Sequence, residues 1–131
     1  MRLYLDAAPV IYLIEENEDY VGIVDQILEK SDVELIASDL TRLECRIKPI
    51  QENNQELLKD YDEFFSDVVS KIVPLSRDVI DRATEIRSEH GFKTPDSIHL
   101  AAAVVSNCDQ FLTNDLRLKK FTDIKIRSVV S

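Results

Sequence analysis

The sequence is poor in the residues that break or crosslink a chain. Its 131 residues include 2 Gly, 4 Pro and 2 Cys, and no Trp. Without a long Gly, Ser or Pro stretch to mark a linker, this composition predicts a single compact, helix-rich domain spanning residues 1–131. Cys45 and Cys108 form neither a disulfide framework nor a CxxC pair, which is typical of a reducing, cytoplasmic compartment.

Basic residues and long apolar runs are also scarce. The chain has 16 Lys and Arg residues against 25 Asp and Glu residues, a net charge of −9, which excludes nucleic-acid binding by bulk charge. An acidic protein of this kind could still act on phosphates if some of its acids hold metal ions and its basic residues are grouped locally. No apolar run approaches the roughly 20 residues of a membrane span, and no secretion signal is evident at the N-terminus. We therefore expect a cytoplasmic protein without a membrane segment.

Hydrophobic periodicity predicts strands and helices that alternate along the chain. Strands are predicted over 2–5, 33–37, 71–75, 110–113 and 124–130; helices over 8–16, 20–30, 39–48, 54–70, 78–89 and 95–107; and a short helical turn over 115–120. Pro74 indicates that the third strand lies at a sheet edge. The alternation predicts an α/β fold of three layers, α/β/α, around a central, mostly parallel sheet of about five strands.

Four residues mark expected helix ends. Ser38 is a good N-cap, and Pro49 is expected to stop the helix that Ser38 begins. Gly91 is a natural C-terminal stop for the fifth helix. Thr94 is expected to cap the last long helix, with a proline at its first position.

Asp6 directly follows the first predicted strand, where the functional crevice of a parallel sheet is expected. Its ordinary interpretation is a helix cap. That interpretation is weakened because Pro9 would then fall at the third helical position, whereas proline prefers the first. From the sequence alone, cap and metal ligand are about equally supported.

Glu44 lies on an apparently apolar helix face. Leu40, Leu43 and Ile47 form the stripe that we expect to face inward, and at 100° per residue Glu44 falls beside Leu40. A carboxylate on an inward face is costly unless it is paired or bound to metal. A buried salt bridge, or a position at the edge of the stripe, is the alternative.

Two further acids also have ordinary explanations. Asp96 begins a helix that is apolar on nearly all sides, and an acid there favours the helix dipole. Asp115 follows a strand, beside Thr113, and would cap the short helical turn. His99 shares a helix face with Asp96, and we interpret it as a hydrogen-bonded core residue rather than a ligand.

The positions of these acids predict a shared site. In a parallel α/β domain they converge on one end of the sheet, and several carboxylates in one pocket need shared protons or a cation. An all-oxygen ligand set suits Mg²⁺ or Mn²⁺ rather than zinc. Such a site activates a water and stabilises charge on a phosphodiester. The sequence has no Ser–His–Asp order, P-loop or GxGxxG motif.

Four segments carry a family resemblance over essentially the whole chain. "YLDAAPVIYLIE", "LTRLECRIKP", "TPDSIHLAAA" and "FLTND" occur in the order found in PIN-domain proteins, and the chain resembles the VapC-type toxins among them. The resemblance implies a single three-layer PIN domain and a ribonuclease that depends on Mg²⁺ or Mn²⁺. It also implies a cognate VapB-like antitoxin and a homodimer.

By the same similarity, Asp6, Glu44, Asp96 and Asp115 would form the acidic quartet that holds metal, with Thr113 assisting. Many members carry Ser or Thr and then Asn after the first acid, whereas this chain has two alanines at positions 7–8, which would weaken the support of the metal site. Candidates for a basic rim are Arg42, Arg46, Lys48, Lys93, Arg117, Lys119 and Lys120.

Two other functions compete with this interpretation. A non-catalytic PIN-like module would bind RNA or protein without cutting, and the alanine pair is its only support. A small phospho-receiver or phosphatase also uses an Asp at a strand end with Mg²⁺. A phosphatase of that type would want a second Asp where Ala8 stands.

Overall fold

The computed structural model describes residues 1–130, and its centre is one parallel sheet. Its strands are β1 (Arg2–Leu5), β2 (Glu34–Ser38), β3 (Lys71–Val73), β4 (Gln110–Thr113) and β5 (Lys125–Ser128). They lie in the order β3-β2-β1-β4-β5, and each neighbouring pair is parallel. The predicted α/β fold with a five-stranded parallel sheet is confirmed, and β3 lies at an edge, as Pro74 indicated.

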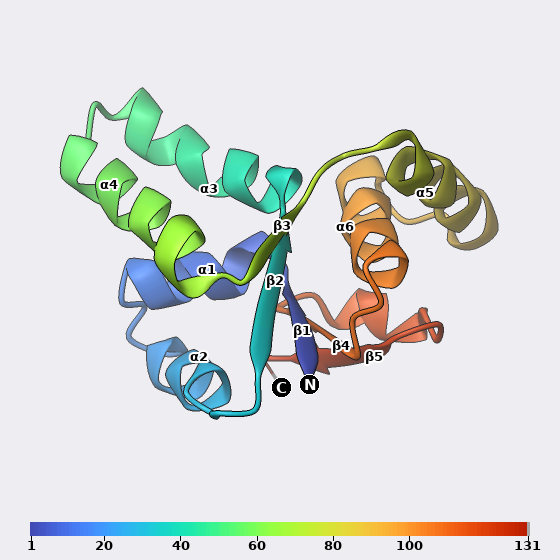
Figure 1. The fold of residues 1–131 in the computed structure, drawn as a ribbon, viewed down its shortest axis with the longest axis horizontal. Coiled ribbons are helices and arrows are strands. Elements are labelled where there is room, and N and C mark those ends of the chain that lie inside the picture. The colour runs from blue at the N-terminus through green and yellow to red at the C-terminus, as the bar shows by residue number, and fades with distance from the viewer. Residues whose placement is uncertain (131) are drawn as a thin grey trace.

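Helices cover both faces of this sheet. Within residues 1–130 they are α1 (Ala7–Ile14), α2 (Val21–Leu28), α3 (Asp39–Gln51), α4 (Gln55–Glu63), α5 (Arg77–His90) and α6 (Thr94–Val105). A π-helical turn (Phe64–Val68) continues α4, and a 3₁₀ helix, η2 (Leu116–Lys120), follows β4. In Figure 1, α1 to α4 lie on one side of the sheet and α5 and α6 on the other, which gives the three layers that the sequence predicts. None of the helices in the described part of the chain is long and apolar enough to cross a membrane.

The alternation of side chains along each strand builds two hydrophobic cores. Leu3 and Leu5 point into the core beneath α1, α2 and α4. Tyr4, between them, points to the opposite core with Ile36 and Phe111. Both faces of a parallel sheet are buried in this way, so its strands are apolar at nearly every position.

The predicted inward stripe of α3 is wrong. Leu43 is 54% and Ile47 is 47% exposed, whereas Thr41 and Cys45 are buried. The reason is a tertiary contact: the Thr41 hydroxyl donates to the carbonyl of Leu5, and this contact holds the other side of the helix toward the sheet. The apolar stripe is left on the surface.

Several helix ends also differ from expectation. Pro49 does not stop α3; it is buried in the last turns and the helix runs to Gln51. A proline there forfeits one helical hydrogen bond, and its burial offsets part of that cost. Thr94 is the first residue of α6 rather than its cap, which is Lys93. Gly91 does end α5, in the left-handed conformation at φ 72° that glycine adopts readily.

A buried hydroxyl and a carboxylate tie three helices together. Glu15, at the end of α1, accepts a hydrogen bond of 2.5 Å from the Tyr61 hydroxyl on α4 and one of 2.7 Å from Lys48 on α3. Burial opposes the charged form of Glu15, but the hydrogen bonds from Lys48 and Tyr61 outweigh it and hold its pKa below the usual range. Tyr61 is fully buried.

We predict that Glu15→Ala lowers the free energy of unfolding by about 1–3 kcal/mol at pH 7, because the Tyr61 hydroxyl is left without its acceptor. The pKa of Glu15 is depressed in the folded state. The stabilisation from its charge is therefore present above the ordinary Glu pKa of about 4.3 and is lost as the pH falls through the folded value. Urea denaturation at pH 7 and at low pH measures both effects. An equal loss in a Tyr61→Phe background would contradict this account.

Candidate metal centre

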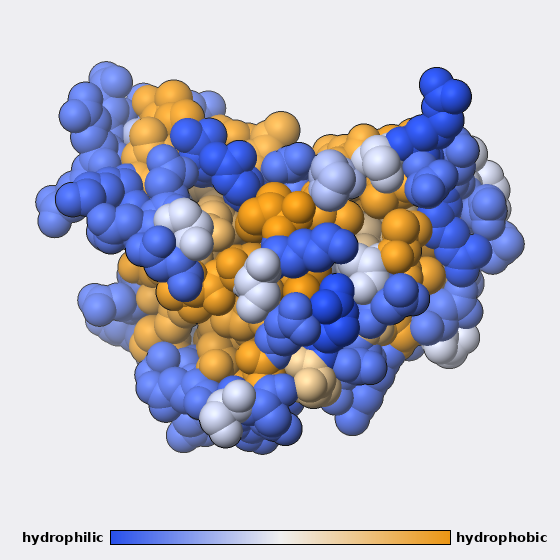
Figure 2. Space-filling model, viewed as in Figure 1, coloured by the Kyte–Doolittle hydropathy of each residue, from blue (hydrophilic) through white to orange (hydrophobic). Residues whose placement is uncertain are grey.

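The acidic residues gather at the carboxyl ends of the central strands. Asp6 directly follows β1, Ser38 ends β2 and Thr113 ends β4. Because β1 lies between β2 and β4 in the sheet, these three ends are neighbours. The ends point to the opening between α3 and α6 in Figure 1, and the molecular outline in Figure 2 is hollowed there. This is the position where parallel sheets bind ligands.

Asp6 is both a helix cap and a member of the site. Its Oδ1 accepts a hydrogen bond of 2.8 Å from the backbone N–H of Ala7, and its Oδ2 accepts one of 2.7 Å from the Thr113 hydroxyl. Pro9 does fall at the third helical position and is buried there. The objection to a cap at Asp6 is therefore wrong, since the first N–H groups of a helix have no partner within it and a proline among them loses no hydrogen bond.

His99 brings a second carboxylate to Asp6. Its Nε2 lies 2.5 Å from Oε1 of Glu44 and 3.4 Å from Oδ1 of Asp6. The imidazole is only 1% exposed. One ligand atom from each of these three residues lies within 4.8 Å of the other two. Sequence reasoning interpreted His99 as a core residue, and it is buried, but its ring also faces both acids.

A chain of buried hydrogen bonds holds the His99 ring. Its Nδ1 lies 2.8 Å from the Tyr4 hydroxyl, which donates to Oγ of Ser38 at 2.8 Å. The Thr41 hydroxyl lies 3.4 Å from that of Tyr4 and donates to the carbonyl of Leu5 at 3.1 Å. Sequence reasoning missed Tyr4 and Thr41. Two signals were available: a hydroxyl between the two leucines of β1, and a threonine at N3 of a helix capped by Ser38.

The charges of the site act on one another. Burial lowers the pKa of His99, but the Glu44 hydrogen bond and the charges of Asp6 and Asp96 outweigh it, so the pKa lies above its usual value. Burial, followed by the charges of Asp6 and Asp115, raises the pKa of Asp96. The smaller part of that rise, which comes from Asp6 and Asp115, is a repulsion between carboxylates that a divalent cation would relieve.

Asp115 lies in the site but is held by a basic neighbour. Its two carboxylate oxygens accept hydrogen bonds from Nε and Nη2 of Arg117, at 3.0 and 2.7 Å. The Arg117 hydrogen bond lowers the pKa of Asp115. The backbone N–H of Asp115 donates to the Thr113 hydroxyl, which links Asp115 to Asp6 through one side chain.

The structure therefore divides the predicted quartet. Among residues 1–130, the close group of donor atoms comprises Asp6, Glu44 and His99. Asp96 is linked to it by charge, and Asp115 faces Arg117. Two carboxylates and an imidazole are a donor set that fits a divalent cation.

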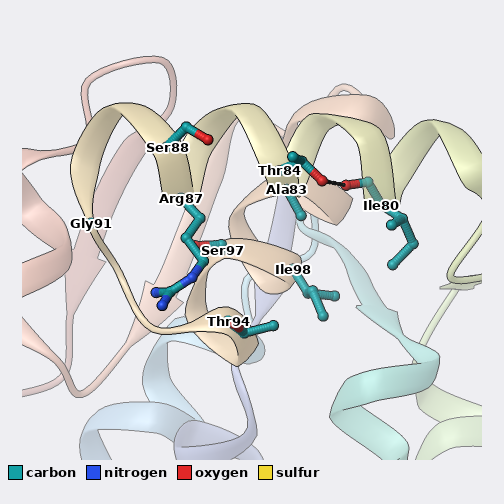
Figure 3. A pocket seen from close by; sticks show the side chains of 9 residues that line it. All are labelled: Ile80, Ala83, Thr84, Arg87, Ser88, Gly91, Thr94, Ser97 and Ile98. Carbon is teal, nitrogen blue, oxygen red and sulfur yellow. Dashed lines mark hydrogen bonds between the residues drawn. The ribbon is translucent and has the colours of Figure 1, made fainter.

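A separate pocket of about 630 Å³ lies between α5 and α6. Its walls are formed by Ile80, Ala83, Thr84, Arg87, Ser88, Gly91, Thr94, Ser97 and Ile98 (Figure 3). The one ionisable side chain among them, Arg87, donates to the carbonyl of Phe92. With no carboxylate or imidazole in its lining, this pocket is not a metal site.

We predict that Thr113→Val lowers the free energy of unfolding by about 1–3 kcal/mol. Valine has nearly the same shape but removes the donor to Asp6 and the acceptor for the Asp115 N–H. Thr113→Ser keeps both hydrogen bonds and is the matched control. Urea denaturation of the two variants measures the difference, and a Val variant as stable as the Ser variant would refute the role of the hydroxyl.

Known proteins share this fold. A chain in the crystal structure of VapBC2 from Rickettsia felis bound to a promoter DNA fragment is similar to this one, with TM-score 0.78 and 16% identity over 98% of both chains. A toxin–antitoxin complex from Klebsiella pneumoniae gives TM-score 0.77 and 21% identity over 98% of both chains. Mycobacterium tuberculosis VapC20, described as a sarcin-ricin loop cleaving toxin, gives TM-score 0.78 and 12% identity over 95% of this chain and 98% of that one.

No curated protein matches the sequence with significant similarity. The family model described as the PIN domain matches residues 3–124, which is nearly the whole chain and includes every acid of the site. The chain belongs to the PIN domain family.

Proposed function

We propose that the protein is a metal-dependent endoribonuclease of the cytoplasm and the toxin of a type II toxin–antitoxin pair. The observation that carries the proposal is the convergence of Asp6, Glu44 and His99 at the carboxyl end of the sheet of a PIN-family chain. The similar structures support the biological role, since they include toxin–antitoxin complexes and a toxin described as cleaving the sarcin-ricin loop.

Asp6, Glu44 and Asp96 would hold Mg²⁺ or Mn²⁺, with Asp115 contributing from the rim. A bound ion lowers the pKa of a water and neutralises charge that develops on a phosphodiester. The protein orients the ligands: the Ala7 N–H and the Thr113 hydroxyl fix the two oxygens of Asp6. Ala7 thus supports Asp6 through its backbone, and Thr113 supplies a polar side chain beside the first acid although positions 7 and 8 do not.

Arg117 is the basic residue best placed to meet the RNA backbone. It lies on Asp115, and its own side chain is 71% exposed. A guanidinium held on one side by a carboxylate still has donors for a phosphate oxygen. Local positive charge at the rim would let an acidic protein bind RNA at this one place.

The alternative is a PIN-like module that binds RNA or protein without cutting. The alanines at positions 7–8 are its support in the sequence. It predicts RNA binding that survives chelation and no cleavage with Mg²⁺ or Mn²⁺.

We predict that Asp6→Asn and Asp96→Asn each lower metal-dependent RNA cleavage by about 10²–10³-fold or more, because each removes a ligand charge where the transition state needs it. Asp25→Asn, at an exposed acid of α2, is the matched control and is expected to cleave normally. Cleavage of a labelled RNA is measured with Mn²⁺, with Mg²⁺ and with EDTA. Full activity of both site variants, or activity in EDTA, would refute the proposal.

The acidic site and the exposed α3 stripe also support a protein partner. We propose a VapB-like antitoxin whose basic segment enters the site and places an Arg or Lys beside Asp6 and Glu44, and a homodimeric toxin. Leu43, Ile47 and Ile50, all about half exposed, offer apolar surface for such an assembly.

We predict that the protein co-purifies with the product of the gene encoded immediately upstream, and that the complex cleaves RNA much more slowly than the free protein. Size-exclusion chromatography with light scattering measures both the complex and the dimer. Separate elution of the two proteins at micromolar concentration would refute the partner, and a monomeric mass for the free protein would refute the dimer.

A further inference from the structure

The hydrogen bonds of the buried chain determine which nitrogen of His99 carries a proton. A carbonyl accepts only, so the single proton of the Thr41 hydroxyl goes to Leu5. The single proton of the Tyr4 hydroxyl goes to Ser38. Tyr4 has no second proton to give, so Nδ1 of His99, 2.8 Å away, must be the donor in that contact.

This assignment leaves Nε2 facing the acids. In a neutral imidazole with a proton on Nδ1, Nε2 presents a lone pair. Here that nitrogen is 2.5 Å from Glu44 and 3.4 Å from Asp6. When no ion is bound, a proton on Nε2 makes the contact with Glu44. A divalent ion bound to Asp6 and Glu44 would displace that proton and take up the Nε2 lone pair, because a metal binds only the deprotonated nitrogen.

We propose that His99 is itself a ligand of the metal ion, through Nε2, together with Asp6 and Glu44. This inference rests on the proposed metal-dependent function and changes the expected ion. A histidine that binds metal through one nitrogen characteristically donates from the other to a fixed partner, and Tyr4 is that partner. Tyr4 is thus a positioning residue.

A nitrogen ligand alters metal preference. Mg²⁺ favours oxygen ligands and octahedral geometry, whereas imidazole suits later divalent ions, whose affinities rise from Mn²⁺ through Fe²⁺ to Co²⁺. An all-carboxylate site would not distinguish Mg²⁺ and Mn²⁺ in this way. The site is therefore expected to prefer Mn²⁺ or a later transition metal over Mg²⁺.

Pulsed EPR of the Mn²⁺-loaded full chain tests the ligand directly. The technique detects the nuclear coupling of a nitrogen bound to Mn²⁺, and the chain has only 2 His residues, His90 and His99. His90→Gln, at the end of α5 against Phe92, is the matched control. We expect nitrogen coupling in the wild type and in His90→Gln, and none in His99→Gln.

Labelling the wild-type protein with ¹⁵N-histidine is a second test that requires no variant to fold. The coupling is expected to change to that of ¹⁵N. Metal titration is a third readout: Tyr4→Phe should keep the coupling and lower Mn²⁺ affinity by about 10–100-fold, and His99→Gln should reduce the preference for Mn²⁺ over Mg²⁺ by about tenfold or more.

The outcomes separate this inference from the proposed function. One outcome is that the wild type binds Mn²⁺, that Asp6→Asn abolishes this binding, and that the bound Mn²⁺ shows no nitrogen coupling. That outcome would overturn the role of His99 and leave the ribonuclease proposal intact. If the protein shows no Mn²⁺ binding that Asp6→Asn abolishes, both the role of His99 and the ribonuclease proposal are overturned. Nitrogen coupling that persists in His99→Gln and disappears in His90→Gln would also overturn the assignment.

Discussion

The pairing of buried polar groups around His99 is the constraint on which the site depends. A buried imidazole, two hydroxyls and a phenol are costly unless each finds a partner. Here Tyr4 reaches from the middle of β1 to the end of β2 and meets both Ser38 and His99. That contact fixes α6 against the start of α3, and so fixes the separation of the acids that these helices carry. Loss of any one member would leave its neighbours unpaired in the interior.

The fold was largely predictable because its signals are local. Apolar strands separated by helical periods specify the parallel sheet, and Gly91 marks the end of α5. The position of Asp6 after β1 follows from that topology. The face of α3 was not predictable in the same way. Leu43 and Ile47 have the ordinary signature of an inward stripe, yet the buried contact of Thr41 turns them outward. An exposed apolar stripe and a core stripe have the same sequence pattern, and only tertiary contacts distinguish them.

The residues of the site were likewise only partly predictable from the sequence. Three acids at strand or helix ends and Glu44 within α3 predict that negative charge converges. After burial, the charges of Asp6 and Asp115 do contribute to the raised pKa of Asp96. Spacing along the chain does not reveal which acids meet. Glu44 reaches Asp6 through His99, whereas Asp115 is engaged by Arg117, two residues further on. The interpretations of Asp6 as a cap and as a ligand also proved compatible, because its two oxygens face different partners.

The central claim is that this end of the sheet holds a divalent ion. Crystals soaked in Mn²⁺ and measured at the manganese absorption edge test it most directly. The account predicts one anomalous peak in contact with carboxylate oxygens of Asp6 and Glu44 and with Nε2 of His99. Density without a peak between these three side chains, at saturating Mn²⁺, would contradict it.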